Sequence, residues 1–409
     1  MNINRDRLWH NLMHLGKIGR NEAGGITRLS FTPEEKEAKA FVADLMEQAS
    51  LAVDEDAMGN LFGRREGRNP QAPAVLIGSH VDSVVNGGMF DGTAGVLSGI
   101  EVLHTLQEHG WQGSHPVEVV AFTDEEGARF STGMLGSQAL VGQLTQEALD
   151  SHKDADGMSV AEAMKEAGYD PLKLREAKRD PSTVKAYLEL HIEQGKVLES
   201  QGLSVGVVTG IVGLRWLHLT LKGEAGHAGT TPMKLRRDPL AAASVVMAYL
   251  EDTVKGEADT VGTVGQLRVR PGGINIIPGE VELTMDIRSL SRATLDKVEQ
   301  ALRQFIDDIC QERKVHCALD VLHRLEPVSC SPGIVDTIEN AVKETGLDLF
   351  HLASGAGHDA MVMARMTDVG MIFVRSKDGV SHNPKEWTEK DDLGDGADVL
   401  LKTVTALAR

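Results

Sequence analysis

Five short motifs contain the residue types that bind divalent metal ions in proteins. Four of them follow predicted strands or begin the next helix, and the fifth lies near the C-terminus. Together they supply His80, Asp91, Glu125, Glu126, His191 and His382. Imidazole nitrogens and carboxylate oxygens suit zinc, manganese, cobalt or nickel, and no cysteine lies near these motifs in sequence. One such motif is weak evidence, because acidic pairs and histidines are often surface or core residues, but five in one chain indicate a metal centre.

The spacing of these residues predicts metal-assisted hydrolysis. A carboxylate such as Asp91 can bridge two ions, which polarise a carbonyl group and lower the pKa of bound water toward ~7. The adjacent Glu125 and Glu126 suggest that one ligates metal while the other acts as general base and later as proton donor. Asp82, two residues after His80, is expected to accept the other ring N–H of that imidazole and fix its tautomer.

The elements that must position these residues can be predicted from hydrophobic patterns. Apolar runs at 74–78, 117–122, 184–190 and 369–374 predict buried strands, and helical spacing marks 93–108 and 389–408. Strands that alternate with helices predict an α/β sheet with crossover connections. Active sites in such sheets form beyond the carboxyl ends of the strands, so residues distant in sequence can converge there.

The middle of the chain has a different pattern. Strand-like alternation and helical spacing follow the order β-α-β-β-α-β, the arrangement of a ferredoxin-like unit. The segments are 213–222, 238–255, 261–269, 279–288, 291–313 and 315–322. We therefore predict a lid or dimerisation domain of residues 212–327. It would be inserted in a discontinuous mixed-sheet catalytic domain formed by residues 1–211 and 328–409.

Composition narrows the possible partners and location. Among 409 residues, 42 basic and 60 acidic side chains give a net charge of −18, which argues against nucleic-acid and anionic-membrane partners. Three cysteines without CxxC spacing favour a reducing compartment. The first residues lack the long apolar run of a signal peptide, so we expect a cytoplasmic protein.

Several motifs together resemble the M20 family of di-metal peptidases and amidohydrolases. They are GSHVDSVVNGGMFDG, TDEEGARF, ELHIEQG, GEAGHAGTTPM and SGAGHDA, and the resemblance extends over essentially the whole chain. Within the family, the chain is similar to N-carbamoyl-L-amino-acid hydrolases, allantoate amidohydrolases and bacterial β-ureidopropionases. Peptidases of the family have an aspartate where this chain has His191, whereas the ureido-cleaving branch has histidine. The resemblance therefore points away from peptide substrates.

The resemblance also implies residue roles. His80 and His191 would hold one metal ion, Glu126 and His382 the other, and Asp91 would bridge them. Glu125 would be the general acid/base and Asp82 the partner of His80. The residues implied to contact substrate are Gln194, His227, Asn275, Arg288, Gly355 and Gly357.

Three of these substrate contacts have specific implied roles. His227 would stabilise the developing oxyanion, often from the partner subunit of a homodimer. Asn275 and Arg288 would grip the substrate carboxylate, for which a guanidinium offers a bidentate fork. Taken without the resemblance, the same residues would be interpreted as a loop histidine, a turn former and a strand-end charge.

The activity implied is hydrolysis of an N-carbamoyl-L-amino acid to the L-amino acid, carbon dioxide and ammonia. Allantoate is the second candidate substrate and N-carbamoyl-β-alanine the third. Two other classes remain as alternatives: a metal-free scaffold protein that kept the fold, and an aminopeptidase or dipeptidase. The presence of all five metal-ligand residues disfavours the first, and His191 disfavours the second.

Overall fold

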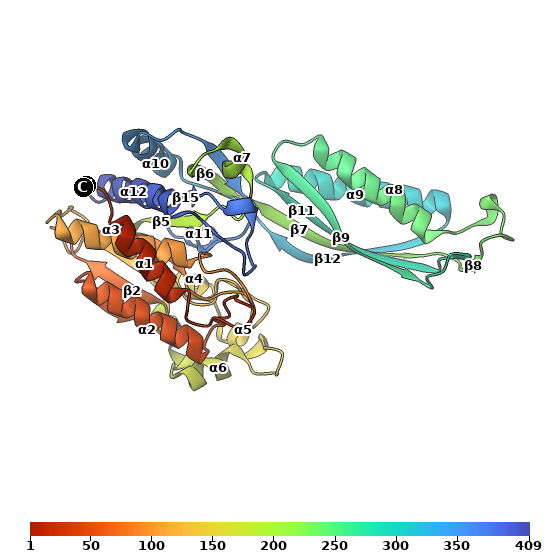
Figure 1. Ribbon diagram of the computed structural model, residues 1–409. Coiled ribbons are helices and arrows are strands. Elements are labelled where there is room, and N and C mark those ends of the chain that lie inside the picture. The colour runs from red at the N-terminus through yellow and green to blue at the C-terminus, as the bar shows by residue number, and fades with distance from the viewer. The chain divides into compact units, whose positions relative to one another are not determined.

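The computed structural model describes all 409 residues, and the chain divides into two compact units. Unit 1 comprises Met1–Thr209 and Cys330–Arg409, and unit 2 comprises Gly210–Ser329. Figure 1 shows both units and labels many of their elements. None of the helices is long and apolar enough to cross a membrane.

A nine-stranded mixed sheet forms the framework of the larger unit. Its strand order is β1-β2-β4-β3-β5-β15-β6-β13, with β14 paired to β6. The strands are β1 (Ala52–Glu55), β2 (Leu61–Arg65), β3 (Ala74–His80), β4 (Val117–Phe122), β5 (Val184–Ile192), β6 (Val205–Ile211), β13 (Val328–Ser329), β14 (His351–Ser354) and β15 (Asp368–Val374). The central strands β4, β3, β5 and β15 run parallel, and β1, β2, β6 and β13 pair antiparallel. The expected mixed α/β sheet is thereby confirmed.

Unit 1 has two hydrophobic cores that include helices, and the larger one also contains side chains of the sheet. The larger core includes side chains of α1 (Arg5–Leu15), α2 (Pro33–Gln48), α3 (Thr93–Glu108), α10 (Pro332–Thr345) and α12 (Lys390–Leu407). The smaller one includes α4 (Leu135–Leu140), α5 (Gln146–Ser151), α6 (Val160–Ala167) and the 3-10 helix η1 (Pro171–Ala177). The remaining helical segments are α7 (Val197–Gln201), α11 (Asp359–Met363), η2 (Pro181–Thr183) and η4 (Lys377–Gly379). Because the central strands are covered by these helices, every residue of β3 and β4 is buried.

Unit 2 is a four-stranded antiparallel sheet with two helices packed against it (Figure 1). Its strands, in the order β12-β7-β11-β9, are β12 (His316–Leu325), β7 (Gly213–Lys222), β11 (Glu280–Ser289) and β9 (Thr260–Arg270). Buried and partly exposed residues alternate along β7 and β11, and the buried face packs on α8 (Pro239–Lys255) and α9 (Arg292–Arg313). A short pair, β8 (Gly226–His227) and β10 (Ile276–Ile277), and the 3-10 helix η3 (Met233–Leu235) complete the unit.

The predicted elements agree closely with the observed ones. The strands predicted at 117–122 and 213–222 and the helix predicted at 93–108 have the observed bounds, and Ser291 is the N-cap of α9. The strand predicted at 184–190 is longer than expected. It continues to Ile192, so His191 lies within β5 and its backbone is fixed by pairing with β15.

Candidate metal centre

The parallel strands bring three groups of predicted metal ligands to one edge of the sheet. His80 is the last residue of β3, Glu125 and Glu126 follow β4 in a turn, and His191 is the penultimate residue of β5. Because β4, β3 and β5 are parallel neighbours, their carboxyl ends lie side by side. Asp91 joins them from the segment between β3 and α3.

One cluster consists of His80, Asp91 and His191, all buried. Asp91 Oδ1 lies 3.1 Å from His191 Nε2 and 3.6 Å from His80 Nε2. The Nδ1 atoms of the two imidazoles face main-chain carbonyls, at 3.1 Å from Asp82 O and 2.9 Å from Ile192 O. An Nδ1–H that donates to a carbonyl leaves Nε2 as the unprotonated nitrogen, so both rings present a nitrogen that can bind metal toward Asp91.

A second cluster consists of Asp91, Glu126 and His382. His382 Nε2 lies 3.4 Å from Asp91 Oδ2 and 3.4 Å from Glu126 Oε2. The other carboxylate oxygen of Glu126 is buried and has no hydrogen-bond partner. The two oxygens of Asp91 therefore face different sets of nitrogen and oxygen atoms, as a bridging carboxylate would.

The N-terminus of α3 lies in close contact with the His80 ring. Gly92, the N-cap residue of α3, has φ of +65°, and a Cβ placed on it would lie 2.5 Å from atoms of the His80 ring. Its amide N–H points at His191 Nε2, 3.2 Å away. Glycine allows both this backbone conformation and the close approach of the imidazole.

The electrostatics of the two clusters favour a bound cation. Burial alone would lower the pKa of His80, but the carboxylates of Glu125 and Asp91 raise it well above its ordinary value. Burial and the charge of Asp91 raise the pKa of Glu126 to about 7, and a hydrogen bond with Asp91 raises the pKa of His382 to about 9. Each shift reflects excess negative charge in a buried space, which divalent cations would neutralise.

Glu125 lies beside the first cluster, and its position is set by Asp82. Glu125 Oε2 is 3.6 Å from His80 Nε2. The carboxylate of Asp82 accepts hydrogen bonds from the amides of Glu125 and Glu126, at 3.2 and 3.1 Å. Nδ1 of His80 lies 3.1 Å from the main-chain carbonyl of Asp82 and 3.6 Å from its carboxylate, so the expected contact between this carboxylate and the imidazole stays a prediction. The same carboxylate also fixes the turn that carries both glutamates.

Gln194 contacts the bridging carboxylate. Its side-chain amide donates to Asp91 Oδ2 at 2.7 Å, and its buried carbonyl oxygen has no partner. Gly355 and Gly357 lie in the segment between β14 and α11. A Cβ on Gly355 would meet no atom within 4 Å, whereas one on Gly357 would press against the methyl group of Met134.

Several buried polar residues around the clusters were not predicted from the sequence. The imidazole of His358 packs against that of His191, with ring centroids 4.4 Å apart, and Glu189 forms a third potential ligand group with both. Glu386 accepts hydrogen bonds from the amides of Phe90 and Asp91. The predictions used the glycines of SGAGHDA and His382, although His358 lies in the first of these segments and Glu386 follows His382 by four residues.

Three predicted substrate contacts lie in unit 2. His227 and Ile276 are paired across β8 and β10, and the carbonyl of Asn275 accepts a hydrogen bond from the amide of Ala228. His227 and Asn275 therefore belong to adjoining segments. Arg288, on β11, donates to the Asp286 carboxylate from Nε and from a terminal nitrogen, the latter at 2.8 Å.

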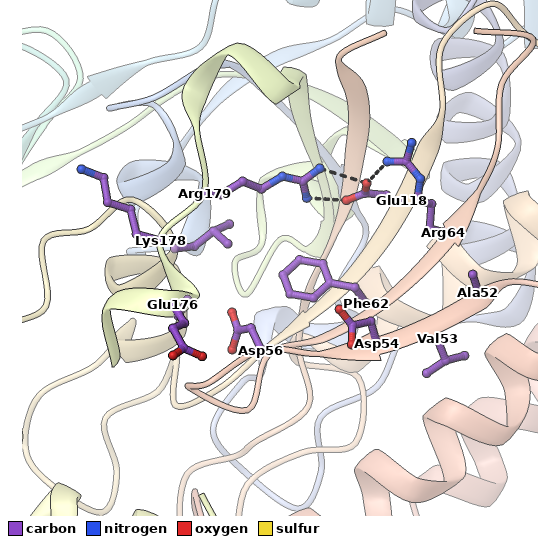
Figure 2. Close-up of a pocket in the computed structure, with 12 residues that line it drawn as sticks. Ala52, Val53, Asp54, Asp56, Phe62, Arg64, Glu118, Glu176, Lys178 and Arg179 are labelled. Carbon is purple, nitrogen blue, oxygen red and sulfur yellow. Dashed lines mark hydrogen bonds and ion pairs between the residues drawn. The ribbon is translucent and has the colours of Figure 1, made fainter. Parts of the chain in front are cut away.

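A separate depression of about 360 Å³ lies over β1, β2 and the end of η1 in unit 1 (Figure 2). None of the predicted site residues lines it. Its buried carboxylate, Glu118, is held between the guanidinium groups of Arg64 and Arg179, as the dashed lines in Figure 2 show. Burial would raise the pKa of Glu118, but these arginines lower it below its ordinary value. The charge of Glu118 is thus compensated by protein groups.

Comparison with known proteins gives a consistent set of relatives. The model of peptidase family M20/M25/M40 matches residues 76–406. The chain is 54% identical to an N-carbamoyl-L-amino acid amidohydrolase of Geobacillus stearothermophilus, covering 100% of this chain and 99% of the relative. It is 45% identical to an N-carbamoyl-L-amino-acid amidohydrolase of Paenarthrobacter aurescens, over 95% of this chain and 94% of that one. An allantoate deiminase of Arabidopsis thaliana is 38% identical, over 96% and 80%.

Solved structures extend the similarity to the fold. A hydantoinase/carbamoylase family amidase from Burkholderia multivorans superposes with a TM-score of 0.94 at 38% identity, covering 100% of this chain and 98% of that one. The aminopeptidase PepT of Bacillus cereus, at 18% identity and a TM-score of 0.71, shares the fold alone.

Proposed function

The chain belongs to peptidase family M20/M25/M40, and from this premise we propose that it hydrolyses N-carbamoyl-L-amino acids. The products would be the L-amino acid, carbon dioxide and ammonia, with one water consumed. The proposal is carried by one observation. The carboxylate of Asp91 lies between two groups of metal-type ligands, in a chain that is 54% identical over its whole length to an N-carbamoyl-L-amino acid amidohydrolase.

Allantoate is a second candidate substrate, because allantoate deiminases of plants are 38% identical over 96% of this chain. It also presents a ureido group beside a carboxylate. N-carbamoyl-β-alanine remains a third candidate. The higher identity to the N-carbamoyl-L-amino-acid amidohydrolases places them first.

We propose that the site holds two divalent metal ions. His80 and His191 would bind one, Glu126 and His382 the other, with one oxygen of Asp91 on each. The unpartnered buried oxygen of Glu126 and the two Nε2 atoms directed at Asp91 fit such a pair. When bound, the ions supply Lewis-acid polarisation of the ureido carbonyl and a lowered pKa of water. The donor set accepts zinc, manganese, cobalt or nickel.

In this mechanism Glu125 moves the proton. As general base it takes a proton from the attacking water, and as general acid it delivers that proton to the leaving nitrogen. Burial raises the pKa of Glu125 well above its ordinary value, which favours its proposed role as proton donor to the leaving nitrogen. Asp82 holds the main chain of Glu125 and Glu126 and so orients both carboxylates. Gln194, whose amide reaches Asp91, would contact the substrate from beside the clusters.

We further propose that unit 2 serves as a lid and dimerisation domain and that its polar residues bind the substrate. His227 would stabilise the developing oxyanion, from its own chain or from a partner subunit. Asn275 and Arg288 would bind the substrate carboxylate, and the segment of Gly355 and Gly357 would line the site. Asp286 holds the Arg288 guanidinium by two of its nitrogens, which preorganises it for such a role.

The three free cysteines support a reducing, cytoplasmic location.

Ammonia release by the purified protein tests the proposal. The protein would be stripped with chelator and reloaded with Zn²⁺, Mn²⁺, Co²⁺ or Ni²⁺. The substrates would be N-carbamoyl-L-methionine, its D-enantiomer, allantoate, N-carbamoyl-β-alanine and a dipeptide. We expect metal-dependent turnover that is highest with the L-carbamoyl compound. Preference for allantoate would make allantoate the assigned substrate. Turnover of the dipeptide alone would overturn the proposed function.

A further inference from the structure

Glu386 is a buried carboxylate whose hydrogen-bond donors all come from segments that carry metal ligands. It lies between β15 and α12, and 3% of its surface is exposed. Its Oε1 accepts the amide N–H groups of Phe90, at 2.9 Å, and of Asp91, at 3.1 Å. Glu386 thus holds the main chain of the central carboxylate residue from a position almost 300 residues later in the chain.

The segment before Asp91 leaves room for this contact. A Cβ placed on Gly88 would overlap the Glu386 carboxylate. Gly88 does not have a positive φ, so its backbone conformation does not itself require glycine. Next to Glu386, the Trp387 ring packs edge-on against Phe90, with centroids 5.4 Å apart. The segment before Asp91 and the segment of Glu386 and Trp387 are therefore packed closely against each other.

Ser381 extends the same network to the second cluster. Its hydroxyl lies 3.1 Å from Glu386 Oε2 and 2.8 Å from Asp91 Oδ2, and the next residue is His382. His382 has φ of +53°, a conformation that a residue with a side chain keeps only where its surroundings enforce it. The contact between Ser381 and Glu386 fixes the segment on one side of it.

We propose that Glu386 is a positioning residue that holds Asp91 and His382 in the arrangement needed to bind the metal pair. The inference rests on the proposed two-ion site. A buried carboxylate is a poor choice for stability alone, because an apolar side chain of similar size would avoid the cost of burying a charge. Here the carboxylate orders two amides of the Asp91 loop and one hydroxyl beside His382. The fully buried Arg28 supplies a favourable charge to both Glu386 and Asp82.

Four variants separate this role from a general effect on folding. E386A removes the carboxylate, G88A displaces it without changing it, and S381A removes the hydroxyl that lies between Glu386 Oε2 and Asp91 Oδ2. E386Q keeps an amide oxygen that can accept from the amides of Phe90 and Asp91. G333A is the matched control, because a Cβ on Gly333 meets no atom within 4 Å and Gly333 also lacks a positive φ.

The readout is Zn²⁺ affinity of the full-length protein, measured by competition with a chelator and by metal analysis, together with the visible spectrum of the Co²⁺ form. We expect E386A and G88A to bind Zn²⁺ about 10- to 100-fold more weakly, the usual cost of losing a group that orients ligands. S381A should also weaken Zn²⁺ binding, E386Q should recover most of the affinity lost in E386A, and G333A should match the parent chain.

Unchanged Zn²⁺ affinity and Co²⁺ spectrum in both E386A and G88A would overturn the proposal. If E386A fails to fold, the Zn²⁺ affinities of G88A and S381A test the proposal. Unchanged affinity in both variants would overturn the proposal. Failure of the proposed function is a separate result. A parent protein that binds two Zn²⁺ ions but releases no ammonia from any ureido compound would refute that function, while the affinity series would still test Glu386.

Discussion

The carboxylate of Asp82 accepts a hydrogen bond at 3.2 Å from the main-chain amide of Glu125, the proposed general acid/base. Its other oxygen accepts the amide of Glu126 at 3.1 Å. Asp82 is therefore an anchor for the turn after β4, and through its main-chain carbonyl it also faces the ring of His80. One residue thus orients three side chains of the site.

This relationship predicts the effect of Asp82→Asn. An amide side chain can accept only one of the two N–H groups and presents its own NH₂ group to the other, so the turn loses part of its support. We expect kcat/KM to fall by about 10- to 100-fold, with metal content reduced less. Asp54→Asn, at an exposed aspartate of β1, is the control. Equal kinetics in the two variants would contradict the anchoring role.

Gly92→Ala is expected to disrupt the site by displacing the His80 ring. The added methyl group would press on the His80 ring, and the positive φ of residue 92 adds a backbone cost of about 1–2 kcal/mol. Gly202→Ala is a matched control, because Gly202 has φ of +70° and a Cβ there meets no atom within 4 Å. Both variants should lose some thermal stability, and only Gly92→Ala should lose metal affinity. Similar metal affinity in both would show that the close approach of Gly92 to His80 does not matter for binding.

Glu125→Gln should separate binding from catalysis. Glutamine fills the same volume but cannot take up the proton, so we expect a drop in kcat of about 10²- to 10⁴-fold. KM and the amount of bound metal should change little, because Glu125 is not among the proposed ligands. The exposed Glu47, substituted by glutamine, controls for loss of a charge. Near-normal turnover of Glu125→Gln would refute its assignment as acid/base.

Local patterns predicted most of the secondary structure and the ligand types. Alternation along residues 213–222 and the apolar run at 117–122 depend on neighbouring residues in sequence, and the strands formed where these patterns lie. The histidines and acids at strand ends could be named because parallel strands share one edge of a sheet.

Contacts between distant segments could not be read in the same way. Nothing near Glu386 in sequence indicates that its carboxylate reaches the amide of Phe90, 296 residues away. Asp82 was predicted to contact His80 because the two are neighbours, but its local sequence did not indicate that its carboxylate also accepts the amides of residues 43 and 44 positions away. Residues that support the proposed ligands are therefore the part of the site that requires the folded structure.

Arg288→Lys is expected to weaken the substrate carboxylate site. Lysine keeps the charge but loses the planar fork, so the paired contacts to a carboxylate become a single one. Loss of a charged hydrogen bond, worth about 1.5–3 kcal/mol, predicts a fall in kcat/KM of roughly 10- to 100-fold, mainly through KM. Arg268→Lys, on the exposed strand β9 of the same sheet, is the control.

Asp286→Asn adds a second test of the same site. Asp286 accepts Nε and a terminal nitrogen of Arg288, so it holds the plane of the guanidinium without being a proposed substrate contact itself. We expect a smaller rise in KM than in Arg288→Lys, and little further loss when both substitutions are combined, because both act through one guanidinium. Additive losses in the double variant would mean that Asp286 acts independently of Arg288, and an unchanged KM in Arg288→Lys would remove Arg288 from the substrate site.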